Sequence, residues 1–137
     1  KKAESEFFVD NSALAGFTGE RILYMSVREL IENSLDSCEI NHILPVIQLS
    51  LKLLDPLNDL WTISCKDNGI GIPQDKLNKL FERFYQIDAS YTREHGGSGL
   101  GLSICKAIID KHDGIIGAHS EGKGNGATFF FKIPLLK

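Results

Sequence analysis

Three separated groups of residues have the types and spacing needed to hold a magnesium-bound anion, and the first lies in a helical pattern. Glu29, Asn33 and Asp36 are spaced by four and three residues, so they share one side of a helix. An amide oxygen of Asn33 suits Mg²⁺ when water and phosphate oxygens complete the octahedron. The Glu29 carboxylate could deprotonate a water as a general base. The alternative is a solvated acidic face, although Glu29, Glu32 and Asp36 repel one another at this spacing.

The second group is a turn after an alternating apolar run, Asp67-Asn68-Gly69-Ile70-Gly71-Ile72-Pro73. A carboxylate held at a strand end can accept a hydrogen bond from the amino group of adenine, whereas guanine has a carbonyl at that position. Gly69 and Gly71 would let the backbone approach a flat base closely. The sequence therefore predicts an adenine site formed by Asp67, Gly69, Gly71 and Ile72; the alternative is an ordinary turn, which Asp-Asn-Gly also favours.

The third group is the glycine-rich segment at residues 96–102. It lacks the Gly-Lys-Ser/Thr of a Walker loop and the Gly-x-Gly-x-x-Gly of a dinucleotide site. It enters a helix, whose free amide groups and dipole attract phosphate; the alternative is a structural glycine hinge. Arg83 is the basic residue that we place first among those able to reach a phosphate. The predicted phosphate contacts are Gly97, Ser98, Gly99, Leu100, Gly101 and Leu102, and the three groups together predict binding of ATP or ADP with Mg²⁺.

The elements that must position these groups follow from hydrophobic periodicity. The first helix has Val27, Leu30 and Cys38 on its apolar face, and its acids and Asn33 are expected on the opposite face. We expect Gly114 to provide the left-handed C-terminal cap of the last helix. The predicted order is a helix (21–40), a hairpin of two half-buried strands (47–53 and 61–65), helices (74–87 and 100–112) and a second hairpin (115–120 and 127–133).

This order predicts an α+β fold, a two-layer sandwich in which about three helices cover one face of a mainly antiparallel mixed sheet. The 137 residues suffice for one domain, which we place at 20–137 after an N-terminal arm at 1–19. The net charge of −3 argues against direct binding of nucleic acid. Three widely spaced cysteines and no long apolar run predict a cytoplasmic protein without a disulfide framework or a membrane span.

The three motifs, in this order, resemble the GHKL family of ATP-binding domains, also called the Bergerat fold. This family includes gyrase B, the MutL proteins, heat-shock chaperones of the ninety-kilodalton class and sensor histidine kinases. Residues 80–134 resemble the catalytic and ATP-binding domain of a sensor histidine kinase. Residues 4–40 resemble the B subunit of type VI DNA topoisomerase, above all in Val27-Arg28-Glu29-Leu30-Ile31-Glu32-Asn33-Ser34-Leu35-Asp36. The chain thus resembles a chimera of the two.

The resemblance implies roles for single residues. Glu29 would be the general base, Asn33 the Mg²⁺ ligand, Asp67 the adenine-binding aspartate and Thr128 a threonine beside the adenine. Histidine kinases usually have Asn at the position of Glu29. Because this chain has a carboxylate there that could act as a base, slow ATP hydrolysis is one expected activity. The second is phosphate transfer to a histidine on a separate domain, and the third is a non-catalytic role as a homodimer formed through the arm.

Overall fold

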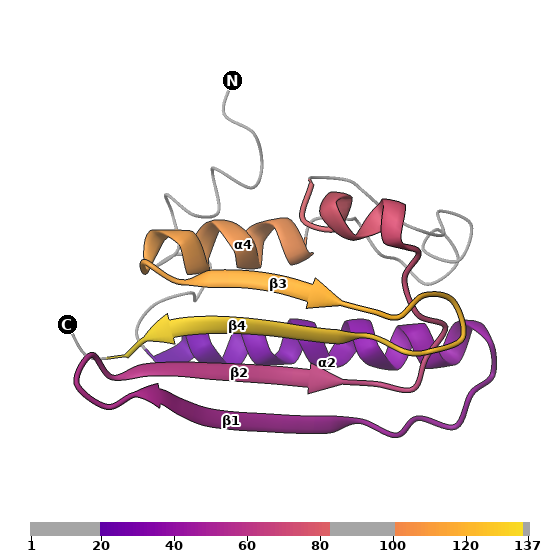
Figure 1. The fold of residues 1–137 in the computed structure, drawn as a ribbon, viewed down its shortest axis with the longest axis horizontal. Coiled ribbons are helices and arrows are strands. Elements are labelled where there is room, and N and C mark those ends of the chain that lie inside the picture. The colour runs from indigo at the N-terminus through magenta and orange to yellow at the C-terminus, as the bar shows by residue number, and fades with distance from the viewer. Residues whose placement is uncertain (1–19, 83–100, 136–137) are drawn as a thin grey trace.

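The computed structural model describes residues 20–82 and 101–135 (Figure 1). The predicted arm and five predicted site residues, Arg83, Gly97, Ser98, Gly99 and Leu100, lie outside these ranges. The described elements are helix α2 (Glu20–Ile40), strands β1 (Gln48–Asp55) and β2 (Leu60–Lys66), the 3₁₀ helix η1 (Gln74–Lys79), helix α4 (Gly101–Lys111), and strands β3 (Ile115–His119) and β4 (Thr128–Pro134).

The four strands form one antiparallel sheet in the order β1-β2-β4-β3. Helix α2 contacts β2, α4 contacts β3, and the two helices contact each other, so both cover the same face (Figure 1). The predicted α+β two-layer sandwich is therefore confirmed. No helix among the described residues is both long and apolar enough to cross a membrane.

The core lies between this sheet and α2 and α4. Alternate residues of β4, namely Phe129, Phe131 and Ile133, point into it because side chains alternate between the two faces of a strand. Helix α2 contributes a stripe at four-residue spacing in which Ser26, Leu30, Ser34 and Cys38 are fully buried. Three of these side chains are small, which lets the helix lie close to the sheet.

The predicted separation of polar and apolar faces on α2 is partly wrong. Glu32 and Asp36 are exposed as expected, but Glu29 and Asn33 are half-buried. They precede the buried Leu30 and Ser34 by one residue and so lie beside the buried stripe rather than opposite it. This side of α2 faces α4 and the turn that follows β2.

The prediction of two half-buried strands is correct for β2 and wrong for β1. Leu49, Leu51 and Leu53 are 52%, 60% and 44% exposed. They pair with Cys65, Ile63 and Trp61, so they lie on the helix-covered side of the sheet. They remain exposed because β1 is an edge strand that α2 and α4 do not cover.

Two local predictions need correction at helix ends. The helix expected at 74–87 is a 3₁₀ helix at Gln74–Lys79 followed by a turn, and residues 83–87 lie outside the described ranges. Leu77 in this helix and Leu80 directly after it are three residues apart, which suits three residues per turn. After α4 the left-handed residue is Asp113, with φ of 60°, and not Gly114. Gly114 is small for another reason, since a Cβ there would lie 2.5 Å from the carbonyl oxygen of Lys132.

Candidate functional site

Asp67 is the buried carboxylate around which the site is built. It directly follows β2 and is 4% exposed. Its backbone N–H donates to the carbonyl of Ala127 at 2.9 Å, which continues the β2–β4 ladder by one residue. Its Oδ1 accepts hydrogen bonds from the backbone N–H of Gly69 at 2.9 Å and of Ala127 at 3.2 Å. The side chain is thus held from both segments that flank it.

The second oxygen, Asp67 Oδ2, is buried and has no hydrogen-bond partner among residues 20–82 and 101–135. A buried acceptor without a donor costs about 1–3 kcal/mol, and more when it is charged, so such groups in folded proteins call for an explanation. A ligand amino group would supply the missing donor. Thr128, the first residue of β4, is half-buried and follows the Ala127 that holds Asp67, so the structure brings these two predicted site residues together.

Glu29 and Asn33 meet the N-terminus of α4. A Cβ on Gly101, the first residue of α4, would overlap Glu29 Oε1, so the carboxylate lies directly against the helix end. The amide nitrogen of Asn33 donates to the carbonyl oxygen of Glu29 at 2.8 Å and to its Oε1 at 3.3 Å. This orientation leaves the amide oxygen of Asn33 for another partner. The first and third predicted groups therefore meet through Glu29 and Gly101, and Leu102 is half-buried against the core.

The charge state of Glu29 is shifted by its surroundings. Burial, and then the neighbouring charges of Glu32 and Asp36, raise the pKa of the Glu29 carboxyl, while the hydrogen bond from Asn33 acts in the opposite direction. A carboxylate with a raised pKa is a stronger base. Burial, with the Glu29 charge as the next cause, raises the pKa of the Cys105 thiol to about 12. The contact between Glu29 and Gly101 places Glu29 beside the first turn of α4.

The acidic side of α2 is less repulsive than its sequence indicates. Glu32 forms an ion pair with Arg28 at 2.9 Å, so a bound cation is not needed to neutralise it. Among the described residues no group of three or more His, Cys, Asp or Glu could hold a metal ion. Asn33 remains suitable for Mg²⁺, because this ion commonly takes one or two protein ligands and completes its shell with phosphate and water.

Gly69 and Gly71 are small for reasons that the sequence did not indicate. A Cβ on Gly69 would overlap Ser37 Oγ of α2, and Ile70 N–H donates to that hydroxyl at 3.1 Å. Gly71 has φ of +77°, and a Cβ there would overlap the carbonyl oxygen of Gly122. The turn is therefore shaped by close contact with α2 and with the loop before β4. Whether either glycine also contacts a ligand stays a prediction.

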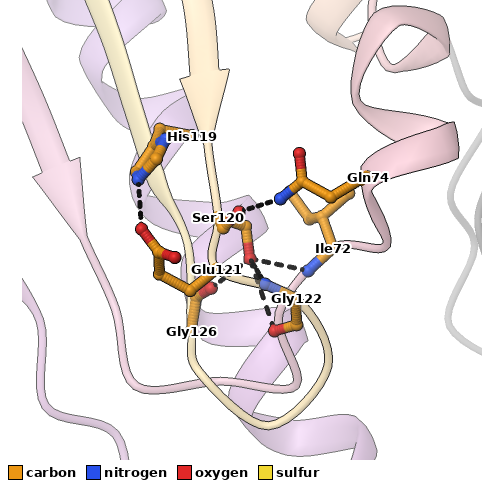
Figure 2. A network of polar contacts seen from close by, with 7 residues as sticks. All are labelled: Ile72, Gln74, His119, Ser120, Glu121, Gly122 and Gly126. Carbon is orange, nitrogen blue, oxygen red and sulfur yellow. Dashed lines mark hydrogen bonds and ion pairs between the residues drawn. The ribbon is translucent and has the colours of Figure 1, made fainter.

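Three polar residues that sequence reasoning did not assign hold the turn in place. Ser37 binds it to α2. The Asn68 side chain accepts from Val46 N–H at 2.8 Å and donates to the Leu44 carbonyl at 3.1 Å, which fixes the connection between α2 and β1. Ser120 lies at the centre of a network that includes Ile72 (Figure 2). The sequence signal for Ser120 is a serine two residues before the first glycine of a glycine-rich turn.

Comparison with known proteins identifies the family. Residues 18–137 match the model of the histidine kinase-, DNA gyrase B- and HSP90-like ATPases. The chain belongs to this family. It is 49% identical over 80 residues to the sensor protein kinase WalK of Staphylococcus aureus, an alignment that covers 58% of this chain and 19% of that protein. For WalK of strain JH9 the covered share is 13%, so the chain spans less than a fifth of these relatives.

Solved structures give the same assignment. The chain is similar to full-length ShkA in complex with AMPPNP, with TM-score 0.66 and 26% identity over 82% of this chain and 21% of ShkA. It is also similar to the catalytic domain of histidine kinase ThkA, with TM-score 0.63 and 27% identity over 82% of this chain and 66% of that domain. The chain is thus an ATP-binding domain of the histidine kinase type. The resemblance of residues 4–40 to type VI topoisomerase stays a prediction.

Proposed function

We propose that this domain binds the adenine of Mg-ATP or ADP at Asp67 and its phosphates beside Glu29, Asn33 and the N-terminus of α4. The observation that carries the proposal is the buried Asp67 carboxylate, in which one oxygen is held by two backbone amides and the other has no partner in the part of the chain that the structure describes. The amino group of adenine is a donor of the required kind. Guanine would present a carbonyl to Oδ2, and two acceptors facing each other are unfavourable.

We place the phosphates of the nucleotide where α2 contacts the N-terminus of α4. The free amide groups at a helix N-terminus favour anions. Glu29 lies against this end, and Asn33 can offer its amide oxygen to Mg²⁺. Mg²⁺, when bound, would offset the charge of the phosphates. Gly101 and Leu102 are the described residues of the predicted phosphate loop. Gly97, Ser98, Gly99, Leu100 and Arg83 remain proposed contacts.

For the reaction itself we propose slow hydrolysis, with Glu29 as the general base. Its raised pKa and its position beside the α4 N-terminus support this role. Replacing Glu29 with Gln keeps the size of the side chain and removes the base, so phosphate release should fall by about 10²- to 10⁴-fold while ADP binding remains. Glu32→Gln, on the exposed side of the same helix, is the matched control.

A second candidate function is transfer of the γ-phosphate to a histidine on a separate domain. The similarity to WalK, a sensor protein kinase, favours it. Labelled ATP mixed with this domain and a separate phosphoacceptor domain would produce labelled protein only in this case. A homodimer formed through the arm at 1–19 remains the non-catalytic alternative, and light scattering with and without nucleotide tests it.

The experiment that tests the adenine site is a calorimetric titration of Asp67→Asn with ADP. The substitution places an amide nitrogen or a weaker acceptor where a carboxylate oxygen was. Hydrogen bonds to charged groups contribute about 1.5–3 kcal/mol, so the affinity should fall by about 10- to 150-fold. Asp75→Asn, at an exposed position in η1, is the control. Full ADP affinity in Asp67→Asn would contradict the assignment.

A further inference from the structure

Ser120 joins two separate segments of backbone through one hydroxyl group. It follows β3 and is 2% exposed. Its Oγ accepts hydrogen bonds from Ile72 N–H at 3.0 Å and Gly122 N–H at 3.2 Å, and it donates to the Gly126 carbonyl at 2.6 Å (Figure 2). The side-chain amide of Gln74 donates to the Ser120 carbonyl. Both the side chain and the backbone of Ser120 are therefore engaged with the segment after β2.

The two segments that Ser120 joins are the ones that hold Asp67. Gly69 N–H comes from the first, and Ala127 N–H, next to Gly126, comes from the second. Direct backbone bonds also connect these segments, from Gly126 N–H to the Gly69 carbonyl at 3.1 Å and from Gly124 N–H to the Ile70 carbonyl at 2.6 Å. The Ser120 hydroxyl adds side-chain hydrogen bonds to both segments, at Ile72 and at Gly126.

We propose that Ser120 is a positioning residue for Asp67. Its hydroxyl keeps the 69–72 and 122–127 segments in register, so that both amides reach Asp67 Oδ1 and Oδ2 is left for the ligand. The effect of Ser120 on the ligand rests on the proposed adenine site. The two hydrogen bonds from the Gly69 and Ala127 amides to Asp67 Oδ1, here called the Asp67 clamp, exist in the nucleotide-free protein. The effect of Ser120 on this clamp does not depend on the adenine site.

Replacing Ser120 with alanine removes the acceptor for the buried Ile72 amide and the part-buried Gly122 amide, and the donor to the Gly126 carbonyl. The Gly69 and Ala127 amides should then bind Asp67 less firmly. Hydrogen exchange at these two amides should become about tenfold faster, and the affinity for ADP should fall by about tenfold, the size of one net hydrogen bond. Exchange at Ile63, within β2, should stay unchanged because this residue belongs to the core and not to the clamp.

The test measures amide exchange without nucleotide, and ADP affinity by calorimetry, for the wild type, Ser120→Ala, Asp67→Asn and the double variant. Ser64→Ala, at a half-buried position of β2, is the control. If Ser120 acts through Asp67, the double variant should bind ADP as weakly as Asp67→Asn alone, since residues that act on one interaction are not additive. If Ser120→Ala does not fold, Ser120→Cys replaces it, because a thiol keeps the volume and bonds only weakly.

The outcomes separate the two proposals. Faster exchange at Gly69 and Ala127 in a protein that does not bind ADP would refute the adenine site and support the positioning role. Wild-type ADP affinity and unchanged exchange in Ser120→Ala would overturn the positioning role. Equal acceleration at Gly69, Ala127 and Ile63 would also overturn it, because it would show a general loss of stability.

Discussion

Replacing Gly126 with alanine should destabilise this domain more than the same change at Gly124, two residues earlier. Both glycines have positive φ, 66° and 86° respectively. Alanine in this left-handed region costs about 1–2 kcal/mol at either position. Around Gly124 no described residue lies within 4 Å of an added Cβ. At Gly126 the Cβ would overlap the Asp67 carbonyl oxygen and lie 3.2 Å from the Asn68 Cα. Gly126 therefore carries an additional steric cost.

Overpacking of this kind costs about 1–3 kcal/mol, which is the expected difference in the free energy of unfolding between the two variants. With about 2.1 cal/mol/K per residue, 137 residues give an unfolding entropy of about 0.29 kcal/mol/K. The two melting temperatures should therefore differ by about 3–10 °C. Thermal unfolding followed by circular dichroism measures this. Melting temperatures that agree within about 1 °C would refute the close approach of the 122–127 segment to Asp67.

Two further predictions concern Glu29 and the edge strand. Burial raises the pKa of the Glu29 carboxyl above its ordinary value of 4.5. The folded protein therefore binds the carboxyl proton more tightly than the unfolded chain does. Its stability falls as the pH rises from the ordinary pKa through the raised pKa of the folded state. Glu29→Gln should therefore raise the melting temperature at pH 7 and have little effect near pH 4; a decrease at pH 7 would mean that the contact with the α4 N-terminus outweighs burial. Leu51→Thr on the exposed β1 should change the free energy of unfolding by no more than about 0.5 kcal/mol, as is usual for surface positions. A denaturant titration that shows a loss above about 2 kcal/mol would mean that Leu51 is covered in solution.

The order of the elements could be predicted from sequence because it depends on local periodicity. The buried positions of α2 recur at helical spacing, and those of β2 and β4 alternate. Both patterns can be read from the sequence of each element alone. The exposure of Leu51 could not be predicted in this way, since an alternating strand looks the same in the middle and at the edge of a sheet. Which strand α2 covers is decided by tertiary packing.

Sequence indicates candidate residues where a side chain could act through its own chemistry, and indicates less where a residue acts through a neighbour. Asp67 stands out as a carboxylate in a glycine turn. Position 69 needs a glycine because Ser37 of α2 lies against it, which depends on tertiary packing. Ser120 lies 48 residues from its hydrogen-bond partner Ile72. Contacts of this range leave no periodic signal in the sequence.

We propose that Asp67 Oδ2, which lacks a hydrogen-bond partner among the described residues, accepts a hydrogen bond from the amino group of adenine. Calorimetric titration of the wild-type protein with ADP and with GDP, each in the presence of Mg²⁺, tests it most directly. ADP should bind at least about tenfold more tightly than GDP, because adenine has an amino donor at the position where guanine has a carbonyl. Equal affinities for the two nucleotides, or no binding of ADP at millimolar concentration, would contradict the account.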